Sequence, residues 1–164
     1  MKFKKLVVKE MKEGTGFKCK IFLNNSRIKN ADIAVYIVNL ADFDEFLYES
    51  KEENRMKEAL ETFETTLSFD MFQNKNVYVF FNKKDLLKKK ILAGGSIKNV
   101  FQDYKEDHDV DKIEKFIIEQ FLNLWKWDPS YLHSFSGQIW DDGDVKKVFE
   151  QVNSIAEQLK KKNG

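Results

Sequence analysis

One short stretch of this sequence combines residue types that could recognise a planar heterocyclic ligand. Asn82, Lys83 and Asp85 lie within Phe-Asn-Lys-Lys-Asp-Leu at positions 81–86, directly after an apolar run. A carboxylate such as that of Asp85 can accept two hydrogen bonds from the ring N–H and amino group of guanine, whereas adenine lacks this donor pair. The lysine stem can cover the base, and the asparagine amide can brace the loop. A strand-end turn with solvated charges explains the tetrapeptide alone equally well.

The surrounding pattern predicts the elements that would position these residues. Residues 33–38 and 77–81 form short apolar runs rich in β-branched and aromatic residues, and residues 131–135 form a weaker run. Such runs are typical of parallel strands covered on both faces. Helical periodicity follows each run, in residues 56–67, 110–124 and 145–159. The alternation predicts an α/β fold with a mostly parallel sheet flanked by helices.

The polar ends of these predicted elements fit the same fold. Asp109 and Asp144 are placed to cap the last two helices. In open α/β sheets, ligands bind beyond the carboxyl ends of the strands. Asn82, Lys83 and Asp85 therefore occupy the edge of the sheet where a ligand would be met.

The first 32 residues allow two interpretations. Residues 6–8 and 18–23 are short strand signals, and Glu13-Gly14-Thr15-Gly16 between them offers turn chemistry. We expect an N-terminal β-hairpin. In the alternative, residues 6–8 form a central parallel strand followed by a glycine-containing loop.

Length and composition limit the class of protein. The chain has 164 residues, with 28 Lys and Arg against 27 Asp and Glu, for a formal net charge of +1. This suggests one domain and gives no general electrostatic attraction to nucleic acid or to an anionic membrane. No apolar stretch approaches the roughly 20 residues of a membrane helix, and no membrane anchor is expected. Cys19 is the single cysteine, which fits a reducing, cytoplasmic location.

A series of short motifs supports a family assignment. In order along the chain they are Asn-Leu-Ala-Asp-Phe-Asp at 39–44, Asn-Arg-Met at 54–56, Phe-Asp-Met-Phe at 69–72, the stretch at 81–86, Asn-Val-Phe-Gln-Asp-Tyr at 99–104, Tyr-Leu-His-Ser-Phe-Ser at 131–136 and Val-Phe-Glu-Gln-Val at 148–152. This series resembles the C-terminal half of the Ras-like domain of heterotrimeric G-protein alpha subunits. The resemblance covers roughly residues 32–159 and implies a partial Ras-like, P-loop GTPase-like fold. We expect residues 1–164 to form one truncated domain of that kind.

The resemblance also implies roles for individual residues. Asn82, Lys83 and Asp85 would form the guanine-specificity loop. The family's second base-contacting loop reads Cys-Ala-Thr, and the matching positions here are Ser136, Gly137 and Gln138. Gly137 would keep the backbone N–H that bonds the guanine carbonyl, whereas Gln138 departs from the family pattern.

Other parts of the family's machinery have no match in this sequence. Gly-x-x-x-x-Gly-Lys-[Ser/Thr] does not occur, and the position of the family's Asp-x-Gly-Gly-Gln segment reads Leu-Asn-Asn-Ser-Arg at 23–27. Without a phosphate loop or the hydroxyl that holds Mg²⁺, we expect no metal site, weak GTP or GDP binding in the roughly millimolar range, and no catalytic residue.

Three functions remain open at this stage. The first is a pseudo-GTPase, a signalling or protein-interaction module that retains a guanine loop. Enzyme activity is left open, but the missing GTPase machinery argues against GTP hydrolysis by this chain. The second is a genuine guanine-nucleotide-binding GTPase, completed by a partner chain or by an unrecognised N-terminal phosphate site. The third is a fragment that retains no activity.

The resemblance implies a protein partner as well. In the family, effectors dock on the helix that matches residues 53–67 and on the loop after it. We expect Met71 and Phe72 to be exposed apolar anchors for an unknown effector-like protein. Binding of a beta-gamma dimer is not expected, because the family's contact segments are not recognised here.

Overall fold

The computed structural model describes residues 31, 33–105 and 108–162. Both readings of the first 32 residues, the hairpin and the central strand, lie outside these described residues. The described residues include nearly all of the part of the chain that carries the family resemblance.

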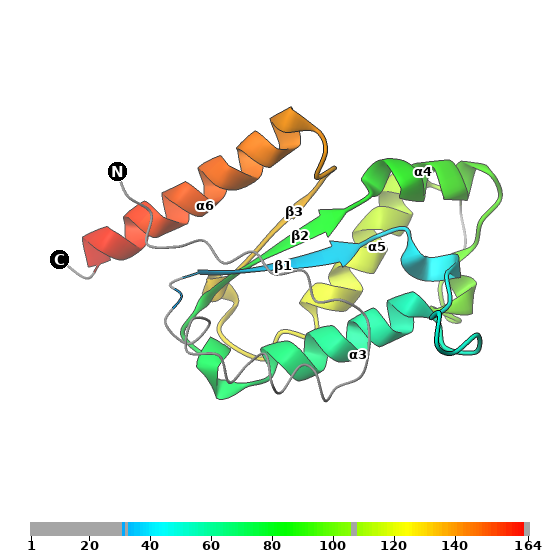
Figure 1. The fold of residues 1–164 in the computed structure, drawn as a ribbon, viewed down its shortest axis with the longest axis horizontal. Coiled ribbons are helices and arrows are strands. Elements are labelled where there is room, and N and C mark those ends of the chain that lie inside the picture. Colours follow the sequence, from blue (N-terminus) through cyan, green and yellow to red (C-terminus); the bar gives the residue numbers. More distant parts are fainter. Residues whose placement is uncertain (1–30, 32, 106–107, 163–164) are drawn as a thin grey trace.

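Three parallel strands form one sheet in the order β1-β2-β3 (Figure 1). They are β1 (Ile33–Asn39), β2 (Asn76–Asn82) and β3 (Leu132–Ser136). The expected strands and their parallel pairing are confirmed, with boundaries shifted by a residue or two. Every residue of β2 is buried, as its unbroken apolar pattern and central position require.

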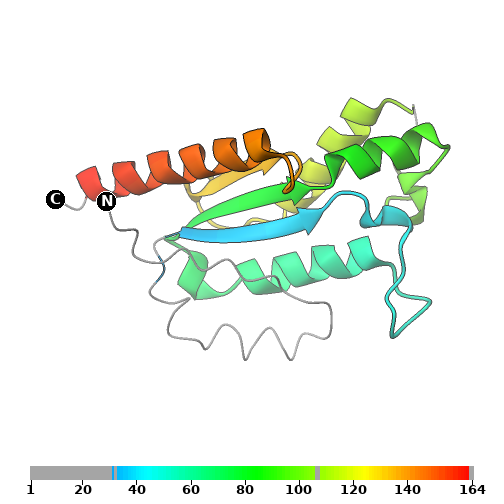
Figure 2. The ribbon, with the colours of Figure 1, turned by 45° about the horizontal axis from the view of Figure 1, so that its top comes forward.

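Helices cover both faces of the sheet. On one face lies α6 (Asp142–Lys162), and on the other lie α3 (Arg55–Leu67) and α5 (Val110–Leu122) (Figure 2). The helix α4 (Lys84–Leu92) follows β2 at the carboxyl edge of the sheet. The connections contain single 3-10 turns, which are η1 (Asp42–Asp44), η2 (Asp70–Phe72), η3 (Ile97–Asn99) and η4 (Pro129–Tyr131).

The larger part of the core lies between the sheet and the pair α3 and α5. The rings of Phe63 from α3 and Phe121 from α5 pack edge to face with centroids 5.5 Å apart, and Phe121 also contacts Phe81 of β2. All three side chains are fully buried. Edge-to-face aromatic packing adds about 0.5–1.5 kcal/mol to the burial of apolar area. This packing fixes β2, and therefore the residues that follow it.

The face beneath α6 has a smaller core. Tyr78 of β2 packs there against Val152 and Ile155, and its hydroxyl donates a hydrogen bond to the side-chain oxygen of Gln151. Burial raises the pKa of Tyr78 to about 12. None of the helices in the described part of the chain combines the length and apolar character of a transmembrane span.

One of the two expected helix caps is confirmed. The Asp109 side chain accepts hydrogen bonds from the N–H groups of Asp111 and Lys112 at the start of α5. The expectation for Asp144 is wrong, because α6 begins at Asp142 and Asp144 lies within its first turn. Instead, Asp141 Oδ1 accepts the Asp144 N–H at 2.9 Å.

Candidate functional site

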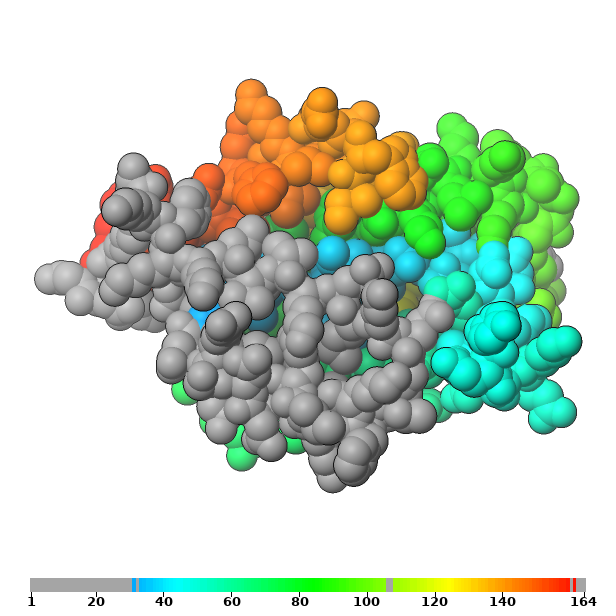
Figure 3. Space-filling model, in the orientation of Figure 1, coloured from blue at the N-terminus to red at the C-terminus, as the bar shows by residue number. Residues whose placement is uncertain are grey.

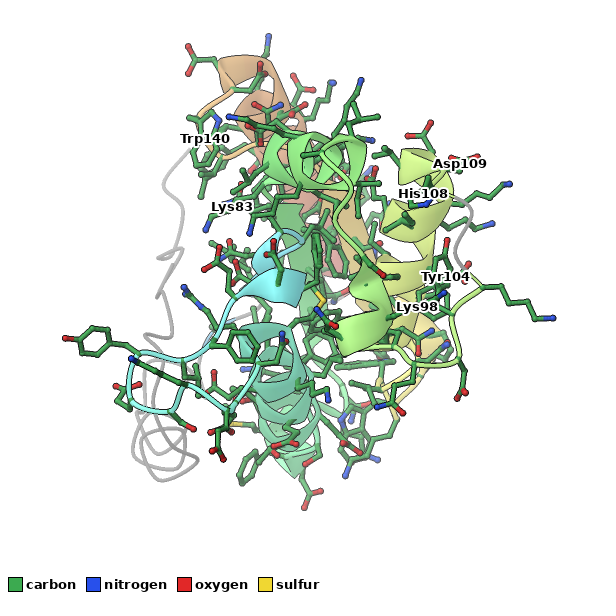
Figure 4. All side chains as sticks on the ribbon, turned by 90° about the vertical axis from the view of Figure 1, so that its right-hand side faces the viewer. Lys83, Lys98, Tyr104, His108, Asp109 and Trp140 are labelled. Atoms are coloured by element: carbon green, nitrogen blue, oxygen red, sulfur yellow. The ribbon has the colours of Figure 1, made fainter. Side chains whose placement is uncertain are left out.

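The carboxyl ends of the three strands bring the predicted loop residues together. Asn39 of β1 pairs with Asn82 of β2, and Phe81 pairs with Ser136 of β3. Figure 4 looks onto this edge and shows Lys83 and Trp140 on one side of it. The segments that follow β1, β2 and β3 therefore line a common edge, as the rule for ligand sites in α/β sheets predicts.

Lys83 makes the turn from strand to helix. Its backbone is left-handed, with φ 64° and ψ 35°, and α4 begins at the next residue. A non-glycine residue in this region carries a strain of roughly 1–2 kcal/mol. The surrounding structure holds this turn, and the turn places Asp85 one step inside the first turn of α4.

Asn82 anchors the segment that follows β3. The residue is buried, with 5% of its surface exposed, and its Oδ1 accepts the backbone N–H of Ile139 at 3.0 Å. The Lys84 N–H also points to the Gly137 carbonyl at 3.5 Å. These contacts join the 82–85 segment to residues 137–141, named here the β3–α6 loop, and Figure 3 shows the two meeting at the surface where green adjoins orange.

Asp85 is the available acceptor of the site. Its side chain is exposed and makes no hydrogen bond or ion pair with any residue that the structure describes. It lies in the first turn of α4, where the helix dipole favours a negative charge. A carboxylate in this state can accept two donors from an incoming ligand.

The backbone N–H of Gly137 has a partner within the sheet. This N–H donates to the Phe81 carbonyl at 2.9 Å and therefore extends the β2–β3 ladder by one bond. In this conformation the donor is used within the sheet, and the expected bond from Gly137 to a ligand carbonyl stays a prediction. The Gln138 N–H also has an acceptor, Asp144 Oδ2 at 3.0 Å.

A partly buried acidic residue lies beside Lys83. Asp42 Oδ1 is 3.9 Å from Lys83 Nζ, and Asp42 Oδ2 is 3.9 Å from Arg55 Nε. Asn39 also donates to Asp42 at 3.4 Å. Burial raises the pKa of Asp42 above its usual value, and the Lys83 ammonium opposes that rise. These contacts hold the Lys83 head group toward the end of β1.

A second ion pair fixes the other flank of the site. Lys84 Nζ lies 2.9 Å from Glu114 Oε2, and Ser136 donates to Glu114 Oε1 at 2.5 Å. Glu114 is buried on α5, so this carboxylate ties α4, α5 and the end of β3 together. An open groove beside it is lined by Lys84 and α5 residues and does not include Asn82 or Asp85.

The predicted partner residues are placed differently. Phe72 is 3% exposed and belongs to the core, so the expectation that it is an exposed anchor is wrong. Met71 is half-buried against the same core. The η2 turn folds Phe72 inward at the opposite end of the sheet from Asn82. Phe46 and Tyr48 are exposed aromatic residues, at 51% and 96%, but they lie between η1 and α3 and not beside Met71.

Sequence reasoning missed three contributors to the site. Asp42 could have been predicted by the rule used for Asp85, because it is also a polar residue that follows a strand. Glu114 and Asp144 gave no such signal, because their roles depend on packing between helices and strand ends. Among the described residues, no three histidine, cysteine or acidic side chains gather in a metal-binding arrangement.

Comparison with known proteins places this geometry in context. The sequence profile described as G-protein alpha subunit matches residues 20–156. The chain is also 28% identical to the guanine nucleotide-binding protein alpha-1 subunit of Mycosarcoma maydis over 131 residues. That match covers 80% of this chain and 37% of the relative, so the chain spans little more than a third of the relative's length.

Proposed function

The chain belongs to the family of G-protein alpha subunits, and from this membership we propose that it is a G-protein-like signalling module of the pseudo-GTPase kind. In this proposal it recognises the guanine base through Asn82, Lys83 and Asp85. Its own residues contribute no phosphate loop and no Mg²⁺ ligand set. Its output is contact with another protein, and hydrolysis of GTP is not part of it.

One observation carries the base-recognition part of the proposal. Asp85 is exposed and unpartnered among the described residues, while its neighbours Asn82 and Lys83 are held by Ile139 and Asp42. Held neighbours around a free carboxylate form a preorganised acceptor. The ring N–H and amino group of guanine would satisfy both oxygens, whereas adenine would leave them without matching donors.

The sequence supports the absence of a phosphate anchor from the module's own residues. Polyphosphates are held in this fold class by a glycine-rich loop of backbone N–H groups, its lysine and a hydroxyl on Mg²⁺. No segment of these 164 residues has that pattern. A base contact alone supports binding in the roughly millimolar range, about 4 kcal/mol.

The proposed partner is an effector-like protein. Met71 is the remaining candidate from the expected docking surface, because Phe72 is a core residue. Substituting Phe72 would therefore test folding and not docking. Replacing Met71 by lysine leaves the buried ring in place and is the informative change for this surface.

The test of the proposal is base selectivity in the intact chain. The backbone amide signals of residues 82–86 are followed by NMR during titration with GMP, and separately with AMP. The proposal predicts saturable shifts with GMP in the millimolar range and at least tenfold weaker shifts with AMP. Equal responses to the two nucleotides, or none to either, would reject the guanine site.

A further inference from the structure

The first three N–H groups of the β3–α6 loop are all satisfied from within the protein. The N–H of Gly137 donates to the Phe81 carbonyl at 2.9 Å, that of Gln138 to Asp144 Oδ2 at 3.0 Å, and that of Ile139 to Asn82 Oδ1 at 3.0 Å. A ligand carbonyl that binds any of these three N–H groups must therefore replace its acceptor within the protein.

The three acceptors differ in how readily they can be replaced. Phe81 is backbone within a fully buried strand, and Asn82 is a buried side chain. Asp144 is a side chain from α6 with 21% of its surface exposed, and rotation about its own bonds can remove it from the loop. Gln138 is therefore the one donor of the three that can be freed without disturbing the sheet.

Gly137 fits this contact closely. A Cβ atom at position 137 would lie 2.7 Å from Asp144 Oδ2 and 2.7 Å from Phe135 Cε1. Real Cβ atoms do not approach oxygen or carbon so closely. The absence of a side chain at position 137 therefore allows the Asp144 carboxylate to reach the loop.

Other contacts hold Asp144 in place. Its backbone N–H donates to Asp141 Oδ1 at 2.9 Å, and its Oδ1 lies 3.5 Å from Lys147 Nζ. The carboxylate also lies in the first turn of α6, where the helix dipole favours it. A charged acceptor in such a position forms a stronger hydrogen bond than a neutral carbonyl does.

We propose that Asp144 is an intramolecular latch, which occupies the Gln138 N–H and keeps it from the carbonyl group of a bound guanine. This inference rests on the proposed guanine site and adds its regulation. In the latched state Asp85 is the site residue without a partner among the described residues, whereas Asn82, Lys83 and the first three loop N–H groups each have one. Release of Asp144 adds the Gln138 donor, so a contact that pulls on the start of α6 would strengthen base binding.

The experiment compares two ways of opening the latch. Asp144→Ala removes the carboxylate, and Gly137→Ala displaces it by crowding. Asp142→Asn is the matched control, because Asp142 is exposed in the same turn and has no hydrogen bond or ion pair with a described residue. GMP affinity and the hydrogen-exchange rate of the Gln138 amide are measured by NMR in the intact chain.

The latch predicts two linked results. Exchange at Gln138 should rise at least tenfold in Asp144→Ala and in Gly137→Ala, while Asp142→Asn behaves as the unmodified chain. Affinity for GMP should rise about tenfold in the same two variants, as expected for the loss of a charge-assisted competitor.

The failures of the latch and of the guanine site give different results. Unchanged exchange at Gln138 in Asp144→Ala overturns the latch whether or not GMP binds. Measurable but equal GMP binding by all chains also overturns it. If exchange rises and no chain binds GMP, the Asp144 contact stands, and the guanine site, with the latch's role in it, is rejected.

Discussion

The side-chain oxygen of Asn82 accepts the backbone N–H of Ile139 at 3.0 Å, across 57 residues of sequence. This bond joins the end of the central strand β2 to the β3–α6 loop. It explains why a polar side chain is buried at the carboxyl edge of an otherwise apolar sheet. The asparagine thus has a structural role that does not depend on a ligand.

Replacement of Asn82 by alanine should destabilise the fold. The substitution leaves the Ile139 N–H without its acceptor in a partly buried position. The expected loss is about 1–3 kcal/mol in the free energy of unfolding, measured by urea denaturation. Replacement of Asn123, which follows the end of α5, provides a matched asparagine control that should change stability by less. Equal losses would show that the Ile139 contact contributes nothing.

Replacement of Asp85 by asparagine should leave stability nearly unchanged and abolish the selectivity for guanine. Asp85 is exposed and unpartnered among the described residues, so the free energy of unfolding should change by less than about 0.5 kcal/mol. Selectivity for GMP over AMP should fall to near unity, because one acceptor oxygen becomes a donor. Asp103→Asn, another exposed aspartate, is the control. Retained selectivity in Asp85→Asn would remove this residue from the site.

Replacement of the helix cap Asn54 by alanine should lower the stability of the fold more than replacement of the cap Asp109. Its Oδ1 accepts from the Met56 and Lys57 N–H groups, and its Nδ2 donates to the Phe43 carbonyl at 2.8 Å. The residue is buried, so Asn54→Ala should cost about 1–3 kcal/mol. Asp109→Ala, at the exposed cap of α5, should cost about 1 kcal/mol. Thermal or urea unfolding of both variants measures the two losses of stability. A larger loss in Asp109→Ala than in Asn54→Ala would contradict the prediction.

His133 should make stability depend on pH. Burial lowers the pKa of His133 below its ordinary 6.5, while its Nε2 lies 2.9 Å from Asn76 Oδ1. The unfolded chain therefore takes up the proton more readily, and stability should fall as the pH decreases from about 6.5 through the folded-state pKa.

The measurement is the free energy of unfolding at pH 7.5 and at pH 5.5. The difference between the two values should be smaller in His133→Asn than in the unmodified chain. His108→Asn is the control, because His108 is exposed and its left-handed backbone, with φ 54°, is tolerated by asparagine. The account fails here if His108→Asn reduces the pH dependence and His133→Asn does not.

The sheet could be predicted from sequence because its strands carry a strong local signal. The unbroken apolar runs of β1 and β2 have few alternatives to a covered parallel sheet. Asp109 was also predictable, since its side chain bonds only to the next few N–H groups. These features depend on neighbours in sequence.

The features that could not be predicted from sequence depend on distant neighbours. Phe72 is buried because the η2 turn folds it into the main core, and its residue type does not distinguish a core ring from an exposed anchor. The use of the Gly137 N–H depends on the register between β2 and β3. The role of Asp144 depends on the length of the β3–α6 loop, which sets where α6 begins.

The most direct test of the central claim is calorimetric titration of the intact chain with GMP, GDP and a non-hydrolysable GTP analogue, with and without Mg²⁺. The claim is base recognition without a phosphate site. It predicts similar affinities for the three nucleotides, each in the roughly millimolar range, and no effect of Mg²⁺. Micromolar affinity that grows with the number of phosphates and requires Mg²⁺ would contradict it and identify a nucleotide-binding GTPase.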